Sequence, residues 1–473
     1  MRGGGHVDTG LLAAALIATL LLLGGCAGTS ALDSSSAGKT TAYVSGTPGF
    51  DIECVPVVSD SLTAIDLYLS VPFPSLIFEK APEGFRARYE ISVRLSDRLS
   101  AAPAEEVSWP ETTTVARYQT TQAFEPIALR RRLAARPGSY RVDVTLEDIV
   151  SGKRAHAAQG VAVHDPADLR PALGRIILMT GTDHGVATPQ ISFFVKEPAD
   201  SIRCDVGAYN LGAGTEVRLT VLRVPADTSI AEPPYWYSVL PLPMGHGLID
   251  FSRADTTCTC VREAAAGRDQ TLTYRLPPPR RGLYRFDAGA TARVAAGADT
   301  LLTASRYYSV RGPGFPRPVT YAEMLAAATY LATRKEAEEF RAAQTTAEQR
   351  KEFEAFWLRC GGNQERAAAL IKKYYARVEE ANRLFTTTRE GWMTDRGMLY
   401  CVLGPPSDML NHLDTQTWYY DLTGNAQDNA FVFKRIVREG DGLTVEDFVL
   451  YRVAGIENFW TRIVSRWRSG EPL

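Results

Sequence analysis

The sequence GWMTDRGMLYCVLGPP, residues 391–406, decides how the C-terminal part of the chain folds. Its tryptophan, Trp392, buries about 150–250 Å² when packed and can fix a turn to the body of a domain. Gly391 follows a long helical pattern, where a left-handed closing residue without a Cβ is favoured. Residues 399–403 form an apolar run of strand length, and the prolines after it cannot continue a strand. We therefore predict the end of a helix, a tight turn and a buried strand over 399–403.

A charge pair, Asp395-Arg396, lies between this tryptophan and the apolar run. In one interpretation the pair is structural: Thr394 and Asp395 hydrogen-bond backbone N–H groups of the turn, while Arg396 stacks on or bridges nearby groups. In the other, it is a recognition or acid–base pair presented on a rigid turn beside an aromatic ring. Charges next to an anchored tryptophan and two glycines are typical of clusters that fix a turn, so we favour the structural interpretation.

The motif carries a resemblance to a known family. Gly391–Gly397, followed by Tyr400, Gly404-Pro405-Pro406 and Trp418-Tyr419-Tyr420, resembles the GWxTD domain of bacterial exported proteins. Further similarity lies in Phe356-Trp357, Tyr374–Asn382, Phe78-Glu79-Lys80 and Tyr89-Glu90, whereas the sequence LRCGG at 358–362 replaces an expected Arg-Asp-Pro-like turn. The resemblance implies no enzymatic activity. The residues we assign to the binding or structural motif are Gly391, Trp392, Thr394, Asp395, Arg396, Gly397, Gly404, Pro405, Pro406 and Trp418.

Composition excludes some classes of protein. A chain of 473 residues suggests roughly two to four domains, each large enough for its own core. Charged residues at 22% and apolar residues at 45% are ordinary globular values and argue against a disordered chain. The net charge of −2 leaves no basic excess to neutralise phosphates, so we expect no nucleic-acid partner.

The first 26 residues predict export and a lipid anchor. Arg2 and the apolar run 11–23 have the form of a signal peptide over residues 1–25, and the run is too short for a transmembrane helix. Leu23-Gly24-Gly25-Cys26 resembles a bacterial lipobox, so Cys26 would be the lipidated first residue; an ordinary signal peptide is the alternative. An alanine at position 27, directly after the cysteine, resembles the sequence of lipoproteins that are sorted to the Gram-negative outer membrane. There the protein would face the periplasm or the cell surface. Each buried acyl CH₂ contributes about 0.8 kcal/mol to anchoring.

The pattern along the mature chain predicts several domains, β-rich and then α+β. Tyr140 and Tyr284 each follow a Gly-x pair at the start of a strand-like segment, which resembles the tyrosine corner of immunoglobulin-like sandwiches. In chain order we predict a flexible tether at 26–47, a β-sandwich-like domain at 48–166, a second at 167–312, a helical connector at 313–386 and a small α+β domain with the GWxTD motif at 387–473.

Helix signals begin after Pro318. Thr320 with Glu323, and Thr345 with Glu348, have the spacing of capping boxes. The apolar periodicity predicts helices at 321–333, 334–343, 347–358, 364–385 and 456–467, and strands at 417–421, 430–433 and 447–452.

The cysteines of the second β domain have two main interpretations. An exported location permits disulfides, so Cys204 could pair with Cys258 or with Cys260. Alternatively, all three are buried free thiols. A Cys-x-Cys pair without further ligands at matching spacing gives little support for a metal site, and we expect no metal.

The sequence contains none of the common catalytic motifs. His-Glu-x-x-His, the phosphate-binding glycine-rich loop, Gly-x-Ser-x-Gly and the dinucleotide fingerprint are all missing, and we expect no cofactor. Cys401 and His412 could form a thiolate–imidazole dyad, but a cysteine inside an apolar run usually packs as an inert hydrophobe. We therefore expect a non-enzymatic, lipid-anchored envelope protein that acts as an interaction or structural module with an envelope protein partner.

Two other functions remain open. One is an envelope-polymer hydrolase that uses Asp395 together with Asp408 or Asp414. The other is a glycan-binding protein that uses Tyr235-Trp236-Tyr237 or Trp418-Tyr419-Tyr420 as a stacking platform, since alternate residues of a strand face opposite ways.

Overall fold

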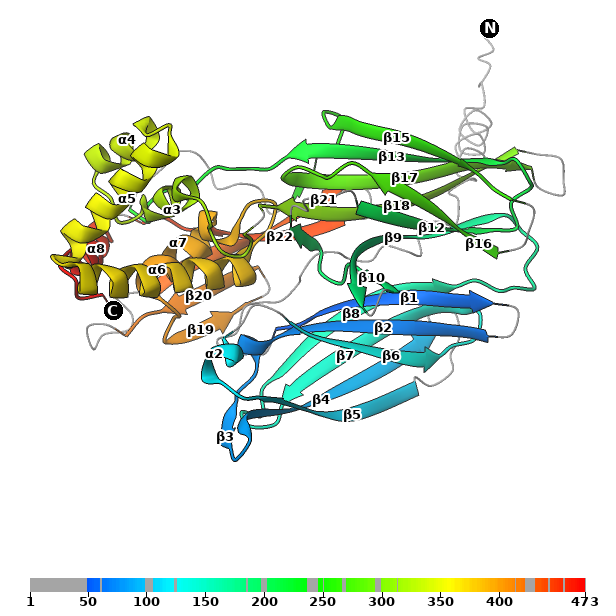
Figure 1. The fold of residues 1–473 in the computed structure, drawn as a ribbon, viewed down its shortest axis with the longest axis horizontal. Helices are drawn as coiled ribbons and strands as arrows, with labels where there is room; N and C mark the ends of the chain where they lie inside the picture. Colours follow the sequence, from blue (N-terminus) through cyan, green and yellow to red (C-terminus); the bar gives the residue numbers. More distant parts are fainter. Residues whose placement is uncertain are drawn as a thin grey trace, which may run out of the picture.

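The computed structural model shows two stacked β-sandwiches with a helical head beside them (Figure 1). The predicted signal peptide, Cys26 and the tether lie outside the residues that it describes. Among those that it describes, no helix has the length and apolarity needed to cross a membrane. The described residues are 49–59, 62–97, 105–122, 126–183, 186–196, 202–235, 246–249, 251–265, 269–293, 299–312, 314–412, 414–421, 430–440, 443–453 and 456–472.

The first sandwich packs a three-stranded sheet, β1-β2-β6, against a five-stranded sheet, β3-β4-β7-β8 with β5 paired to β4. Strand β4 buries every second residue from Ala87 to Leu95 and turns Arg88 and Arg94 to solvent, which is the alternation of a half-buried strand. The elements are β1 (Asp51–Ser59), β2 (Leu62–Pro72), η1 (Phe73–Ser75), β3 (Glu79–Ala81), β4 (Gly84–Asp97), β5 (Glu105–Val115), α2 (Tyr118–Thr121), β6 (Pro126–Ala134), β7 (Gly138–Asp148) and β8 (Arg154–Val163).

The second sandwich packs a four-stranded sheet, β10-β9-β12-β16, against a five-stranded sheet, β11-β18-β17-β13-β15. Its core includes Val206 of β12 and Leu219 of β13, which belong to opposite sheets and lie in the same hydrophobic cluster. The strands are β9 (Ala172–Asp183), β10 (Val186–Pro189), β11 (Phe194–Lys196), β12 (Ile202–Tyr209), β13 (Glu216–Pro225), β15 (Asp255–Glu263), β16 (Asp269–Leu276), β17 (Gly282–Arg293) and β18 (Asp299–Arg311).

Both predicted tyrosine corners form. The Tyr140 hydroxyl donates to the Arg136 carbonyl at 3.0 Å. The Tyr284 hydroxyl donates to the Arg280 carbonyl at 2.8 Å and accepts from the Arg280 N–H at 2.9 Å. In each sandwich the phenol therefore closes the connection that precedes its strand.

A buried carboxylate joins the two sandwiches. Glu53 of β1 accepts from Arg306 of β18 at 2.7 Å and lies 3.0 Å from Nη2 of Arg175 in β9. Because one carboxylate meets two guanidinium groups away from water, the pairing couples the position of the first sandwich to the second.

The head combines helices with a five-stranded sheet, β14-β21-β20-β19 with β22 paired to β21. A single hydrophobic cluster runs from Leu325 to Trp467, so the predicted boundary at 387 passes through a continuous core. The elements are β14 (His246–Leu248), α3 (Tyr321–Ala328), α4 (Arg334–Ala342), α5 (Thr346–Gly361), α6 (Gln364–Phe385), η2 (Gly391–Met393), α7 (Asp395–Leu403), β19 (Asp408–Asn411), β20 (Thr415–Tyr419), β21 (Ala430–Gly440), β22 (Leu443–Leu450) and α8 (Glu457–Arg468).

Local signals set the helix ends of the head. The capping boxes at Thr320 and Thr345 form as predicted, and Thr333 forms another with Glu336. The sequence LRCGG at 358–362, which replaces the expected Arg-Asp-Pro-like turn, continues helix α5 as far as Gly361. Gly362 then ends the helix in the left-handed conformation, with φ at 72°.

The predicted strand over 399–403 is wrong, because those residues belong to helix α7. Every residue of α7 is buried, so its apolar run has the same pattern as a strand covered on both faces, and periodicity alone does not separate the two. Thr394 starts the helix by accepting from the Gly397 N–H at 3.1 Å. Gly391 is not a left-handed closing residue either; it begins the short 3₁₀ turn η2.

Candidate functional site

The turn over residues 391–397 is built on two glycines that touch neighbouring backbone. A Cβ on Gly391 would lie 1.9 Å from the Ala381 carbonyl oxygen of α6. A Cβ on Gly397 would lie 1.8 Å from the carbonyl oxygen of Gly391. Real Cβ atoms do not approach this closely, so the turn folds against α6 and onto itself only with glycine at both positions.

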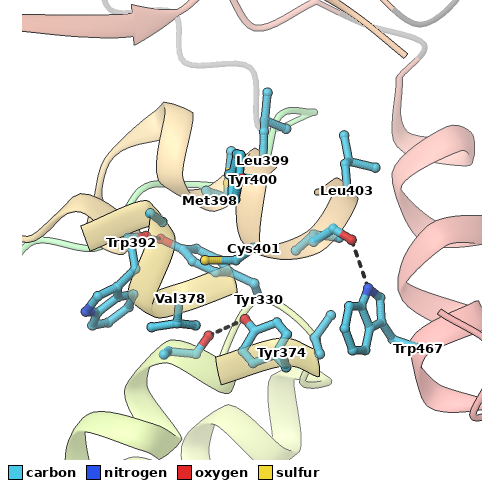
Figure 2. Packing of buried hydrophobic residues seen from close by; sticks show 14 of the residues in the cluster. Tyr330, Tyr374, Val378, Trp392, Met398, Leu399, Tyr400, Cys401, Leu403 and Trp467 are labelled. Carbon is cyan, nitrogen blue, oxygen red and sulfur yellow. Dashed lines mark hydrogen bonds between the residues drawn. The ribbon is translucent and has the colours of Figure 1, made fainter. Parts of the chain in front are cut away.

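The tryptophan of the motif is buried on all sides. Trp392 is 1% exposed, and its ring lies edge-on to that of Tyr330 (Figure 2). Its Nε1 donates to Glu390 at 3.0 Å, and its backbone N–H donates to Asn382 Oδ1 at 3.2 Å. The Tyr330 hydroxyl in turn donates to the Trp392 carbonyl at 2.9 Å. Since each polar group has a partner, this residue anchors the turn to α6 and to the end of α3.

Asp395 faces the interior, not solvent. Its carboxylate is 5% exposed and accepts from the Leu450 N–H of β22 at 2.8 Å. Arg452 donates to the other carboxylate oxygen at 2.6 Å. The partner of Asp395 is therefore Arg452, fifty-seven residues along the chain, and not the adjacent Arg396.

Arg396 lies between aromatic rings. Its guanidinium carbon is 4.0 Å from the centre of the Phe448 ring and 5.0 Å from that of Phe385. Burial lowers the pKa of Arg396 to about 10, against the opposing effect of the carboxylates of Asp447 and Glu446. The predicted charge pair is thus structural in geometry, but each member has a partner of its own.

The same arginine that holds Asp395 also holds a loop of the second sandwich. Arg452 donates to the carbonyl oxygens of Glu232 at 2.8 Å and Pro233 at 3.3 Å. Beside them, the Ala231 N–H donates to the Met393 carbonyl at 2.9 Å. Residues 226–235, which follow β13, are therefore fixed on the turn by side-chain and main-chain bonds.

The remaining motif residues support the same core. Gly404 ends α7, and its carbonyl accepts from the Tyr420 hydroxyl at 2.9 Å. Pro406 is buried, whereas Pro405 is exposed. Trp418 is fully buried, with Nε1 donating to Gln416 at 2.8 Å.

A groove opens next to this turn. It has a volume of about 920 Å³ and lies between loop 226–235, α3, the region around α4 and α8. Its floor includes the buried Leu325, Phe340 and Trp460, and its rim includes the exposed Thr461 and Ser465. The motif residues themselves lie behind the wall of this groove and hold that wall in place.

A comparison with known families agrees with this geometry. The family model of the GWxTD domain matches residues 295–469, a range that takes in β18, the helices α3 to α8 and the head sheet strands β19 to β22. Residues 295–469 are a GWxTD domain. The helices that we predicted as a separate connector thus belong to the GWxTD domain, as their shared core indicates.

Other comparisons add no functional information. No curated protein matches the sequence. Red sea bream transglutaminase is similar over 55% of this chain and 31% of its own, at 9% identity and a TM-score of 0.17. A tetra-tandem repeat from the extending region of a large adhesion protein is similar over 56% of this chain and 50% of its own, at 11% identity and a TM-score of 0.18. The chain thus spans about a third of the length of the transglutaminase and half the length of the adhesion-protein repeat. TM-scores this low carry no argument about activity or partners.

The sites suggested as catalytic do not come together in the GWxTD domain. Cys401 is fully buried in α7, and burial raises its pKa well above the ordinary range, whereas His412 is exposed in a turn after β19. Asp408 and Asp414 are exposed, while Asp395 is enclosed. The carboxylate of Asp395 is instead bound by Arg452 and by the Leu450 N–H of β22.

The other candidate residues are placed as follows. Cys204, Cys258 and Cys260 are free thiols, not a disulfide. Cys204 lies in β12 and the other two in β15, on opposite sheets around one core. Within the described residues, no group of three His, Cys, Asp or Glu side chains could hold a metal ion. Tyr235 lines the groove, and the other two residues of its triplet lie outside the described residues.

Sequence reasoning missed the residues that complete the turn. Arg452 binds Asp395 from 57 residues along the chain, Asn382 binds Trp392 from 10 residues before it, and Glu390 binds Trp392 from the position just before the turn. Of these, only Asn382 lies in a stretch that carries the family resemblance, and no role was assigned to it. Loop 226–235, which carries no motif, was missed as well. The one usable signal was the arginine two residues past the buried end of β22, a position that alternation places next to the core.

Proposed function

We propose that the protein is a non-enzymatic, lipid-anchored protein of the cell envelope whose GWxTD head acts as an interaction or structural module. The observation that supports this is the use of Asp395: both carboxylate oxygens are bound by Arg452 and by the Leu450 N–H inside the fold. A catalytic carboxylate needs access to substrate. Here the most distinctive residues of the motif stabilise the contact between the head and the second sandwich.

The anchor would hold the chain through Cys26 to the outer membrane of a Gram-negative bacterium. Support comes from Leu23-Gly24-Gly25-Cys26 and the apolar run before it. The two sandwiches would then act as a spacer that carries the head away from the membrane.

One experiment tests both parts. Living cells would be treated with a membrane-permeant crosslinker, and the wild-type chain and its Cys26→Ala variant would be recovered from separated membranes. We expect the wild type to be in the membrane fraction, crosslinked through residues of the GWxTD domain to a defined envelope protein, and Cys26→Ala to be released. Turnover of a cell-wall polymer by the purified chain, lost in a folded Asp395→Asn variant, would instead identify an enzyme.

A further inference from the structure

The groove beside the GWxTD turn is not filled by the internal packing of the described residues. Its volume of about 920 Å³ lies in the range of roughly 300–1,000 Å³ found for ligand sites. The floor is apolar, with Leu325, Phe340 and Trp460 buried, and the rim carries exposed hydroxyl groups of Thr461 and Ser465. An apolar floor inside a polar rim binds a ligand by burial and orients it with a few polar contacts.

The helices α3 and α8 form two walls of the groove. Along α3 and its C-cap the lining residues recur at helical spacing, from Ala322 through Ala326 to Thr329. On α8 the stripe runs from Trp460 through Val464 to Arg468, a rise of about 12 Å at 1.5 Å per residue. That length matches three to four residues of extended chain, at about 3.3 Å each.

The third wall offers free main-chain groups. The N–H of Ala231 donates to the Met393 carbonyl, so the main chain at Ala231 faces the motif. Its neighbour Ile230 lines the groove, and among the described residues neither the N–H nor the C=O of Ile230 has a hydrogen-bond partner. An extended peptide can pair with such groups in the way that it adds a strand to a sheet edge.

The charges of the lining favour a peptide over an anionic lipid. Arg468 is already bound to Glu336 at 2.8 Å, but within the described part of the chain the guanidinium of Arg341 has no carboxylate partner. Glu232, on the loop wall, is exposed and likewise unpaired through its side chain in that part of the chain. One cation and one anion in the same groove suit a ligand with both a carboxylate and N–H donors, whereas a fatty acid can pair with Arg341 but has no N–H donor for Glu232.

We propose that this groove binds an extended peptide segment of a partner protein, apolar over three to four residues and carrying a carboxylate that pairs with Arg341. The inference rests on the proposed role of the head as an interaction module and specifies the chemistry of its partner. The carboxylate is either an acidic side chain or the C-terminus of the segment.

The test begins with a phage-displayed library of random peptides selected on the full chain. Ser465→Trp places a large ring on the groove rim, and Arg462→Trp makes the same change on an exposed position of α8 outside the lining. We expect apolar peptides with a carboxylate to be enriched on the wild type and on Arg462→Trp, and their affinity to fall at least about tenfold on Ser465→Trp.

Two charge-reversal variants test whether the peptide carboxylate pairs with Arg341. Arg341→Glu reverses the cation at the rim, and Arg366→Glu makes the same change on an exposed arginine of α6 that does not line the groove. We expect Arg341→Glu to weaken binding of the selected peptides by at least about tenfold and Arg366→Glu to leave it unchanged, since only Arg341 would make a charge-assisted hydrogen bond with the peptide carboxylate.

Two results would overturn the proposal. One is a library that yields no peptide lost on Ser465→Trp and kept on Arg462→Trp. The other is a fluorescent fatty acid, cis-parinaric acid, that binds the wild type and is excluded by Ser465→Trp while no peptide behaves this way. The crosslinking experiment separates these failures from the proposed function, because a partner captured equally by wild type and Ser465→Trp leaves the module intact and places its contact elsewhere.

Discussion

Arg452 donates to Asp395 at 2.6 Å and to the Glu232 carbonyl oxygen at 2.8 Å, so one guanidinium connects the GWxTD turn to a loop of the second sandwich. Its side chain is 16% exposed and that of Asp395 is 5% exposed. A charge pair this enclosed is costly to break, because the remaining partner stays buried without a counterion. The pair therefore gives the acidic residue of the motif a structural role that does not require a catalytic one.

The first prediction concerns the energy of this pair. Asp395→Asn and Arg452→Met should each lower the free energy of unfolding by about 3–5 kcal/mol, because each leaves a buried polar partner. The double variant should lose less than the sum by at least about 1 kcal/mol. Denaturant unfolding of the four proteins measures this, with Asp408→Asn as an exposed control. Additivity within about 0.5 kcal/mol would show that the two residues do not act as a pair.

The second prediction concerns Gly397. An added Cβ would lie 1.8 Å from the Gly391 carbonyl oxygen, so Gly397→Ala should lower the free energy of unfolding by more than about 3 kcal/mol or prevent folding of the head. In Gly212→Ala the new Cβ would meet only Thr215 Oγ1, at an ordinary 3.6 Å, and the change should be within about 1 kcal/mol. Thermal unfolding of both variants tests the difference, and equal melting temperatures would refute the close contact.

The third prediction compares the two tyrosine corners. Tyr284 is 1% exposed and makes two hydrogen bonds with Arg280, whereas Tyr140 is half-buried and makes one with Arg136. Tyr284→Phe should therefore lower the free energy of unfolding by about 1–3 kcal/mol and Tyr140→Phe by less than about 1 kcal/mol. Urea denaturation of the two variants is the measurement. A larger loss in Tyr140→Phe would contradict the assigned geometry.

The fourth prediction concerns pH. Burial alone would raise the pKa of Glu336, but hydrogen bonds from Arg468 and Thr333 hold it at about 2, below its ordinary 4.5. A carboxyl with a depressed pKa stabilises the fold above pH 4.5, and that contribution is lost as the pH falls toward 2. Because solvent screens part of these interactions, the contribution to the free energy of unfolding is smaller than the roughly 3 kcal/mol that the full shift would give.

The matching variant is Glu336→Gln, which should be less stable than wild type at neutral pH and should show a flatter dependence between pH 4.5 and 2. Glu338→Gln, on the exposed face of α4, is the control. Free energies of unfolding at several pH values measure the effect. An unchanged acid slope in Glu336→Gln would mean that another carboxylate controls it.

Short-range signals in the sequence were sufficient for much of the fold. The capping residues Thr320 and Thr345 predicted where helices start, because a side-chain cap depends on residues three apart. Tyr140 and Tyr284 predicted both sandwiches because the corner also closes within a few residues. The family resemblance of the heptapeptide was confirmed by the match over 295–469.

Longer-range relationships could not be predicted. Residues 399–403 are apolar on every face, and only the tertiary covering by α6, β22 and α8 makes them a helix. Arg452 and loop 226–235 reach the turn from distant parts of the chain, and although alternation along β22 places Arg452 next to the core, no spacing in the sequence indicated Asp395 as its partner. The groove depends on four segments at once, and its position follows from packing rather than from a motif.

The central claim is that the GWxTD turn is an internal joint between the head and the second sandwich. Amide hydrogen exchange at Ala231, whose N–H donates to Met393, tests it most directly in wild type and in Arg452→Met. We predict at least about tenfold faster exchange at Ala231 in the variant, with the exchange of Val206 in the core of the second sandwich unchanged. Equal exchange at Ala231 in both proteins would contradict the claim and would return Asp395 and Arg452 to consideration as a recognition or catalytic pair.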